Sequence, residues 1–258
     1  MAAQRLPSLV EDGNLSKFTR VPAPGLQMRR NMAMATTAPW VDSNLWQYRR
    51  APGKLYFCDV TGKSVELAMA EAYSQDVALA LKIAPDQRRA FDEMTAFLTA
   101  LPEGPLARWV NIAVSDDGSE AAGEALNLLS RRNLFYQSGV TKAVLQLRLT
   151  RGITNPYEFM QEARQKLTDE KRILRLFGSE ITLAEVRRDT RRVRIHLINY
   201  GTRAVESLRL RLEGRYSAIT ARVFQAPGAQ LTDVTPDGAF TEFSLSRLPV
   251  YAVIDLRN

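Results

Sequence analysis

The fold is indicated most clearly by the last third of the chain, where residues 193–197 read Val193-Arg-Ile-His-Leu197 and residues 208–212 read Leu208-Arg-Leu-Arg-Leu212. Apolar and polar residues alternate in both stretches, which is typical of antiparallel strands with one buried face. Turn signals such as Pro227-Gly228 separate further extended runs that follow them. The pattern predicts a small antiparallel β-sandwich over residues 179–258.

Before Gly178 the pattern changes, because short apolar runs alternate with segments of helical periodicity. Leu55-Tyr-Phe-Cys-Asp-Val60 predicts a buried strand and residues 64–74 predict a helix. The alternation continues with strands at residues 77–83 and 109–114, with helices at residues 119–131 and from 155 to about 167, and ends with a strand at residues 173–177. Residues 51–178 therefore predict an α/β domain, with a three-layer flavodoxin-like or amidotransferase-like sheet. Residues 1–50 are rich in proline with little periodicity, and we expect an irregular N-terminal arm there.

Composition predicts a soluble globular protein. Hydrophobic residues make up 45% of the chain and charged residues 24%. No run approaches the roughly 20 apolar residues of a membrane-spanning helix, and residues 1–30 lack the apolar core of a signal peptide. The net charge of +7 and several arginine pairs leave anion or nucleic-acid binding as an alternative function. No nucleic-acid-binding motif accompanies the charge, so we interpret the pairs as solvated surface.

The chain offers few groups for catalysis, since it has one cysteine, Cys58, and one histidine, His196. Cys58 lies in an apolar strand, and His196 is expected on the polar face of a strand in the sandwich; both are interpreted as structural. Neither a zinc site nor a cofactor is predicted. Asp116 and Asp117 follow a central strand and are the candidate catalytic carboxylates, although Asp-Asp-Gly is also ordinary turn chemistry.

A second candidate site lies in the arm, where residues 40–46 read Trp40-Val-Asp-Ser-Asn-Leu-Trp46. Indole rings together with planar polar groups suit a sugar, which has apolar C–H faces and a polar rim. The predicted ligand-binding residues are Trp40, Asp42, Asn44, Trp46 and Arg49. The alternative is that these side chains pin the arm to the α/β core.

Several stretches together resemble the C-terminal part of bacterial proteins of the glycoside-hydrolase type. In these proteins a catalytic barrel is followed by a class I glutamine-amidotransferase-like α/β domain and a small β-sandwich. The stretches are Pro39-Trp-Val-Asp-Ser-Asn-Leu-Trp46 with Arg49, Ala70-Glu-Ala72, Asn127-Leu-Leu-Ser-Arg-Arg-Asn-Leu-Phe135, Asn155-Pro-Tyr-Glu-Phe159, Lys171-Arg-Ile-Leu-Arg-Leu-Phe-Gly178 and Arg194-Ile-His-Leu-Ile-Asn-Tyr-Gly201.

This resemblance implies an accessory role beside a carbohydrate-active barrel. The chain has no such barrel, and it lacks the nucleophile elbow and catalytic histidine of an amidotransferase. We therefore expect a non-catalytic protein that binds a glycan, or assembles with itself or with a glycosidase barrel. A carboxylate-dependent glycan hydrolase remains the enzymatic alternative. The resemblance is compatible with a location outside the cytoplasm, and the sequence identifies no compartment.

Overall fold

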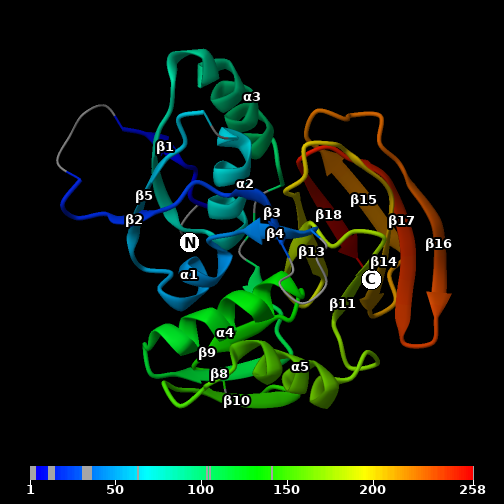
Figure 1. The fold of residues 1–258 in the computed structure, drawn as a ribbon. Helices are drawn as coiled ribbons and strands as arrows, with labels where there is room; N and C mark the ends of the chain where they lie inside the picture. The colour runs from blue at the N-terminus through cyan, green and yellow to red at the C-terminus, as the bar shows by residue number, and fades with distance from the viewer. Residues whose placement is uncertain are drawn as a thin grey trace.

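The computed structural model describes residues 4–10, 15–30, 37–62, 64–102, 104, 106–140 and 142–257 as a mixed α/β fold with several small sheets. Figure 1 shows two helix-flanked regions on the left, one above the other, and an antiparallel β region on the right. An α/β part followed by antiparallel strands is thus confirmed. A single flavodoxin-like layered sheet is not seen, because the parallel strands divide between two sheets.

The first parallel sheet has the order β1-β6-β5-β2. Its strands are β1 (Ser8–Leu9), β2 (Thr19–Val21), β5 (Leu55–Asp59) and β6 (Ala78–Lys82). The apolar runs predict β5 and β6 correctly. The prediction that residues 1–50 are irregular does not hold for the described residues, since β1 pairs with β6 and β2 pairs with β5. Strands of two and three residues are too short to show an alternating pattern.

The other elements of this region are a hairpin and three helices. The hairpin consists of β3 (Gly25–Arg30) and β4 (Thr37–Asp42); the helices are α1 (Leu45–Arg50), α2 (Val65–Gln75) and α3 (Arg88–Thr99), the last preceded by a 3₁₀ turn (Pro85–Gln87). Ser64 begins α2, because its hydroxyl accepts a hydrogen bond from the N–H of Leu67 at 3.2 Å. Residues 65–75 are almost all buried, so α2 is the central helix of the molecule.

The second parallel sheet has the order β10-β8-β9, with two helices packed together beside it. Its elements are β8 (Ile112–Asp116), α4 (Glu120–Arg131), β9 (Tyr136–Ser138), β10 (Leu145–Leu149) and α5 (Pro156–Leu167). Ser119 and Asn155 cap the two helices through their side-chain oxygens. A separate apolar core, including Leu126, Leu129 and Met160, holds this unit together.

The sandwich consists of two antiparallel sheets with the orders β11-β14-β17-β16 and β15-β18-β13-β12-β7. Its strands are β7 (Ala107–Arg108), β11 (Leu174–Phe177), β12 (Thr182–Arg188), β13 (Arg192–Asn199), β14 (Val205–Glu213), β15 (Ala218–Val223), β16 (Leu231–Asp237), β17 (Phe240–Leu248) and β18 (Tyr251–Arg257). The antiparallel strands that the alternating pattern predicts are therefore present.

Two segments that we expected in the α/β sheet belong to the sandwich instead. β11 pairs antiparallel with β14, and Trp109 packs in the sandwich core rather than beginning β8. Short apolar runs look alike in parallel and antiparallel sheets, so their partner could not be read from the sequence. The division of the chain into units at residue 178 stays a prediction.

The face of the β12-β13-β18 sheet that we expected to be solvated is covered by α2 (Figure 1). His196 is fully buried there, and its Nδ1 lies 2.6 Å from the hydroxyl oxygen of Tyr251. Arg194 forms a bidentate ion pair with Asp255, with both distances at 2.8 Å. The polar face of this sheet is therefore buried rather than exposed to solvent. The charges of Arg194 and Asp255 are paired and His196 is hydrogen-bonded through Nδ1, so α2 can pack on it.

Candidate functional site

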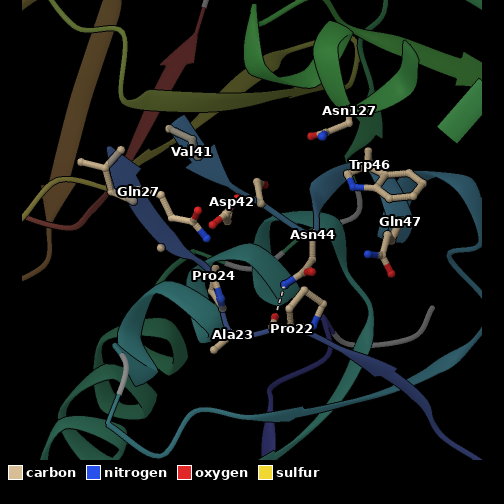
Figure 2. Close-up of a pocket in the computed structure, with 13 residues that line it drawn as sticks. Pro22, Ala23, Pro24, Gln27, Val41, Asp42, Asn44, Trp46, Gln47 and Asn127 are labelled. Carbon is tan, nitrogen blue, oxygen red and sulfur yellow. Dashed lines mark hydrogen bonds between the residues drawn. The ribbon is translucent and has the colours of Figure 1, made fainter. Parts of the chain in front are cut away.

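A cavity of about 470 Å³ lies where the β3-β4 hairpin meets α1 and α4 (Figure 2). The loop between β2 and β3 supplies one wall, which includes Pro22. The hairpin supplies a second wall, and Asn127 of α4 stands on the opposite side. The full lining is Pro22, Ala23, Pro24, Gly25, Leu26, Gln27, Val41, Asp42, Ser43, Asn44, Trp46, Gln47 and Asn127, which we call the hairpin pocket.

The floor of the hairpin pocket is fixed by Asn44, the residue that precedes α1. Its amide nitrogen donates to the carbonyl oxygen of Pro22 at 2.9 Å and to the carboxylate of Glu71 at 3.1 Å. The backbone N–H of Asn44 also donates to Glu71, at 3.1 Å. Asn44 therefore joins the loop before β3, the start of α1 and the middle of α2 at the floor of the pocket.

Glu71 is the most perturbed carboxyl group near the pocket. It is fully buried, and burial raises its pKa to about 7 although hydrogen bonds from Tyr200, Ser43 and Asn44 oppose the shift. The Tyr200 hydroxyl donates to it at 2.5 Å, which links the sandwich to α2. Glu71 is surrounded by hydrogen-bond donors and does not line the cavity. Its position is therefore that of a residue that holds Asn44 in place rather than one that contacts a ligand.

Several polar side chains of the hairpin pocket are available to a ligand. Within the described residues, no hydrogen bond joins the side-chain amides of Gln27 or Gln47 to another group. The Asn127 amide nitrogen makes one long contact, 3.4 Å to Glu124. Asp42 is 3.7 Å from the guanidinium of Arg29, and its side chain is 27% exposed. Amides and a carboxylate thus offer both donors and acceptors to one small volume.

Trp46 supplies the aromatic surface of the pocket. Its six-membered ring lies against α4, where a Cβ placed on Gly123 would come within 3.0 Å of it. Figure 2 shows the nitrogen-bearing edge of the indole turned toward Asn127. Among the described residues, no group accepts a hydrogen bond from this indole N–H. The ring is therefore anchored at one edge and free to bind at the other.

The structure gathers three of the five predicted ligand-binding residues, since Asp42, Asn44 and Trp46 line the pocket. Trp40 lies outside it, with the guanidinium of Arg131 3.2 Å and that of Arg29 3.9 Å from its ring centre. Arg49 points away and is buried, with its guanidinium 2.7 Å from Glu185 of β12. Although the two residues are only three apart on α1, Trp46 contacts α4 at Gly123, whereas the longer side chain of Arg49 reaches β12.

Asp116 and Asp117 are both held in structural contacts. Arg50 binds Asp116 in a bidentate pair, with distances of 2.6 and 2.7 Å. Asp117 accepts hydrogen bonds from the N–H groups of Ser119 and Arg151 at 2.9 and 2.8 Å. A hydrogen bond with the Ser119 side chain and then these two backbone bonds lower the pKa of Asp117 to about 2. The N–H of Gly118 also donates to Asp116 at 2.9 Å, so both aspartates take part in the turn that the sequence offered as the alternative.

Cys58 and His196 are buried, and neither reaches the hairpin pocket. Burial raises the pKa of the Cys58 thiol to about 12, so it carries almost no thiolate at neutral pH. Burial also lowers the pKa of His196 well below its ordinary value. Within the described ranges no three His, Cys, Asp or Glu side chains are placed to share a metal ion. None of the described helices is long and apolar enough to span a bilayer.

The sequence interpretation missed Gln27, Gln47 and Asn127. Glutamine and asparagine carry no charge and form no motif, and these three come from a strand and two helices. Asn127 stands between Leu126 and Leu128, so a polar residue interrupting an apolar helix stretch was the one signal available. Tertiary structure alone brings the three amides together.

Comparisons with known proteins identify a shared fold and no family. No protein-family model and no curated protein sequence matches the chain. Its structure is similar to that of alpha-L-fucosidase isoenzyme 2 from Paenibacillus thiaminolyticus, with a TM-score of 0.53 and 7% identity, over 83% of this chain and 62% of that one. The chain thus spans about three fifths of the length of that structure.

Two xylanase structures match at TM-scores too low to carry an argument. The glycoside hydrolase family 30 subfamily 8 xylanase Xyn30A from Clostridium acetobutylicum has a TM-score of 0.25 and 8% identity, over 83% of this chain and 71% of that one. The GH30 endoxylanase from Clostridium papyrosolvens C71 also has a TM-score of 0.25, with 9% identity, over 90% and 76% of the chains. An amidotransferase-like resemblance is not shown by these matches. The structural neighbours are glycoside hydrolases, and what this chain shares with the fucosidase is its fold.

Proposed function

We propose that this protein is a non-catalytic glycan-binding accessory protein of a carbohydrate-active system, and that the hairpin pocket is its binding site. One observation carries the proposal: the indole edge of Trp46 and the side chains of Gln27, Gln47 and Asn127 meet in one cavity, and of these side chains only that of Asn127 has a hydrogen bond among the described residues, a long one of 3.4 Å to Glu124. The glycoside-hydrolase fold of the structural neighbours supports a link to glycans.

The chemistry of the pocket suits a neutral sugar. A pyranose presents hydroxyl groups that both donate and accept hydrogen bonds, and the amides of glutamine and asparagine do the same. Asp42 adds an acceptor for a hydroxyl pair, and the indole of Trp46 covers apolar C–H groups. A cavity of about 470 Å³ falls within the range of small-molecule sites, roughly 300–1,000 Å³, and is large enough for one or two sugar units.

The absence of catalysis is part of the proposal, and the contacts of the carboxylates support it. A glycosidase needs two carboxyl groups roughly 5 to 10 Å apart that face one substrate. Asp116 is occupied by Arg50, and Asp117 by backbone N–H groups. We further propose that the α/β part is amidotransferase-like and that the chain assembles with itself or with a glycosidase barrel.

Calorimetric titration with a panel of neutral oligosaccharides tests the binding proposal. Gln47→Ala and Asn127→Ala each remove about 1 kcal/mol of hydrogen bonding, so each is expected to weaken binding about fivefold. Gln146→Ala is the matched control, since this exposed amide of β10 lies outside the pocket, and it is expected to bind as the wild type does.

Two results of the titrations would contradict the binding proposal, and one activity result would favour the enzymatic alternative. A panel in which no sugar binds contradicts the proposal, as do pocket variants that bind like Gln146→Ala. Hydrolysis of a glycoside by the wild type that is lost in Asp117→Asn would support the enzymatic alternative instead.

A further inference from the structure

A second and larger cavity, of about 1160 Å³, shares no lining residue with the hairpin pocket. Three segments form it: the strand β7 with Trp109, the turn between β12 and β13, and the turn between β14 and β15. We call it the arginine groove; its lining is Leu106, Ala107, Arg108, Trp109, Arg188, Asp189, Thr190, Arg191, Arg192, Val193, Glu213, Gly214, Arg215 and Tyr216.

The arginine groove carries an excess of positive charge. Among the described residues, no carboxylate forms an ion pair with Arg188, Arg191 or Arg215, although all three are exposed at the groove. The carboxylate of Asp189 caps its own turn, where it accepts hydrogen bonds from the backbone N–H groups of Arg191 and Arg192 at 2.7 and 2.8 Å. Clustered guanidinium groups in a concave surface attract anions.

The groove also has flat, oriented surfaces. The guanidinium of Arg188 lies 4.1 Å from the ring centre of Trp109, so its plane is held rather than free in solvent. Tyr216 is fixed by its hydroxyl, which donates to the carbonyl oxygen of Glu213 at 2.7 Å. Its ring packs over Gly214, where a φ of +109° and the missing Cβ leave the necessary space. A guanidinium held in this way is prepared for a bidentate bond to a carboxylate.

The two carboxylates in the lining decide between polyanions. Glu213 and Asp189 repel any polyanion, and they repel a nucleic acid most strongly because its duplex form carries about one charge per 1.7 Å. A polysaccharide of uronic acids has one carboxylate per sugar, with hydroxyl groups between them. Its carboxylates can bind the arginines while its hydroxyls donate to Glu213.

We propose that the arginine groove binds an acidic polysaccharide of the uronate type, with Arg188, Arg191 and Arg215 holding its carboxylates. This site is independent of the hairpin pocket. The proposal therefore stands or falls separately from neutral-sugar binding, because the two sites have no residue in common.

Fluorescence anisotropy with an end-labelled oligogalacturonate, added to the full chain, tests the proposal. The double variant Arg191→Gln/Arg215→Gln is expected to lower the affinity tenfold or more, since a hydrogen bond to a charged group contributes about 1.5–3 kcal/mol. The control Arg148→Gln/Arg203→Gln removes the same charge from exposed positions outside the groove, and it is expected to change the affinity less than about twofold. The fully methyl-esterified oligosaccharide, which has the same backbone without the charge, is expected not to bind.

Three results would overturn the proposal. Equal weakening in both double variants would show attraction to net charge alone, and equal binding of the methyl ester would show that the carboxylates are not recognised. Tighter binding of a single-stranded DNA of equal charge, lost in Arg191→Gln/Arg215→Gln, would assign the groove to nucleic acid. Circular dichroism of each variant confirms that the fold is retained.

Discussion

At the scale of single residues, the support of the hairpin pocket depends on one buried carboxyl group. Glu71 receives hydrogen bonds from Asn44 and Tyr200, and no cationic side chain is paired with it among the described residues. Its fully buried position favours the protonated form, which is why its pKa rises to about 7. The protonation of Glu71 therefore depends on pH near neutrality, and Glu71 is the group that holds Asn44 at the floor of the pocket.

The raised pKa of Glu71 makes a prediction about stability. Between about pH 4.5 and pH 7 the unfolded state releases this proton while the folded state keeps it, so the contribution of Glu71 to stability falls as pH rises. The loss is on the order of 3 kcal/mol across that window. Glu71→Gln, which does not titrate, is expected to gain stability relative to the wild type as pH increases from 5 to 8.

Urea unfolding of both proteins at several pH values measures this difference. His196 titrates in both proteins and cancels in the comparison, although its own lowered pKa makes stability fall in acid. A constant difference between Glu71→Gln and the wild type from pH 5 to pH 8 would mean that the pKa of Glu71 is not raised.

At the scale of elements, α1 is held by a buried ion pair that joins it to the sandwich. Arg49 lies 2.7 Å from Glu185, and Glu185 also accepts from Gln75 of α2 and faces Arg108 at 3.2 Å. Charges nine-tenths buried are tolerated here because they are paired with each other. Trp46 lies on the same short helix, which is also held in place by the hydrogen bond from Asn44 to Glu71 and by the buried side chains of Leu45 and Tyr48.

Removing the arginine separates the structural interpretation from the ligand-binding one. Arg49→Met is expected to cost about 3 kcal/mol, since Glu185 loses a buried partner, and to leave sugar affinity unchanged in the folded protein. Arg148→Met, at an exposed position, is the control, with an expected change within about 0.5 kcal/mol. Chemical unfolding and calorimetric titration provide the two readouts. If Arg49→Met has normal stability but no longer binds sugar, Arg49 contacts the ligand and its role is not structural.

How far the elements could be predicted depends on the range of the forces that fix them. Local signals located α2, α4 and α5 well, because Ser64, Ser119 and Asn155 cap them directly. Strand β11 and the start of the run at Trp109 were expected in the wrong sheet, because pairing is decided by partners far along the chain. For the same reason the sequence suggested Asp42, Asn44 and Trp46 and could not show that Asn127 faces them.

At the scale of the whole molecule, one apolar core runs across the proposed division at residue 178. It contains Tyr48 and Met69 from the α/β part together with Tyr200 and Tyr251 from the sandwich. The ion pair between Arg49 and Glu185 crosses the same interface. The two parts therefore stabilise each other, whatever their evolutionary origin.

The predicted boundary at residue 178 divides the fold, but the core shared across it predicts that both sides unfold together as one cooperative unit. Differential scanning calorimetry is expected to show a single transition whose calorimetric enthalpy equals its van't Hoff enthalpy. Two resolved transitions, or a stable fragment of residues 179–258 with native-like circular dichroism, would instead support separable domains.

The central claim is that the hairpin pocket binds a sugar, and the three tryptophans of the chain allow a direct test. Each indole N–H gives one peak in a ¹⁵N–¹H correlation spectrum, and the peaks are assigned by replacing Trp40, Trp46 and Trp109 with phenylalanine in turn. A neutral oligosaccharide that binds in the pocket is expected to move the Trp46 peak most, while the peak of Trp109, in the arginine groove, stays in place. A panel of sugars that leaves the Trp46 peak unmoved at millimolar concentration, or moves only that of Trp109, would contradict the account.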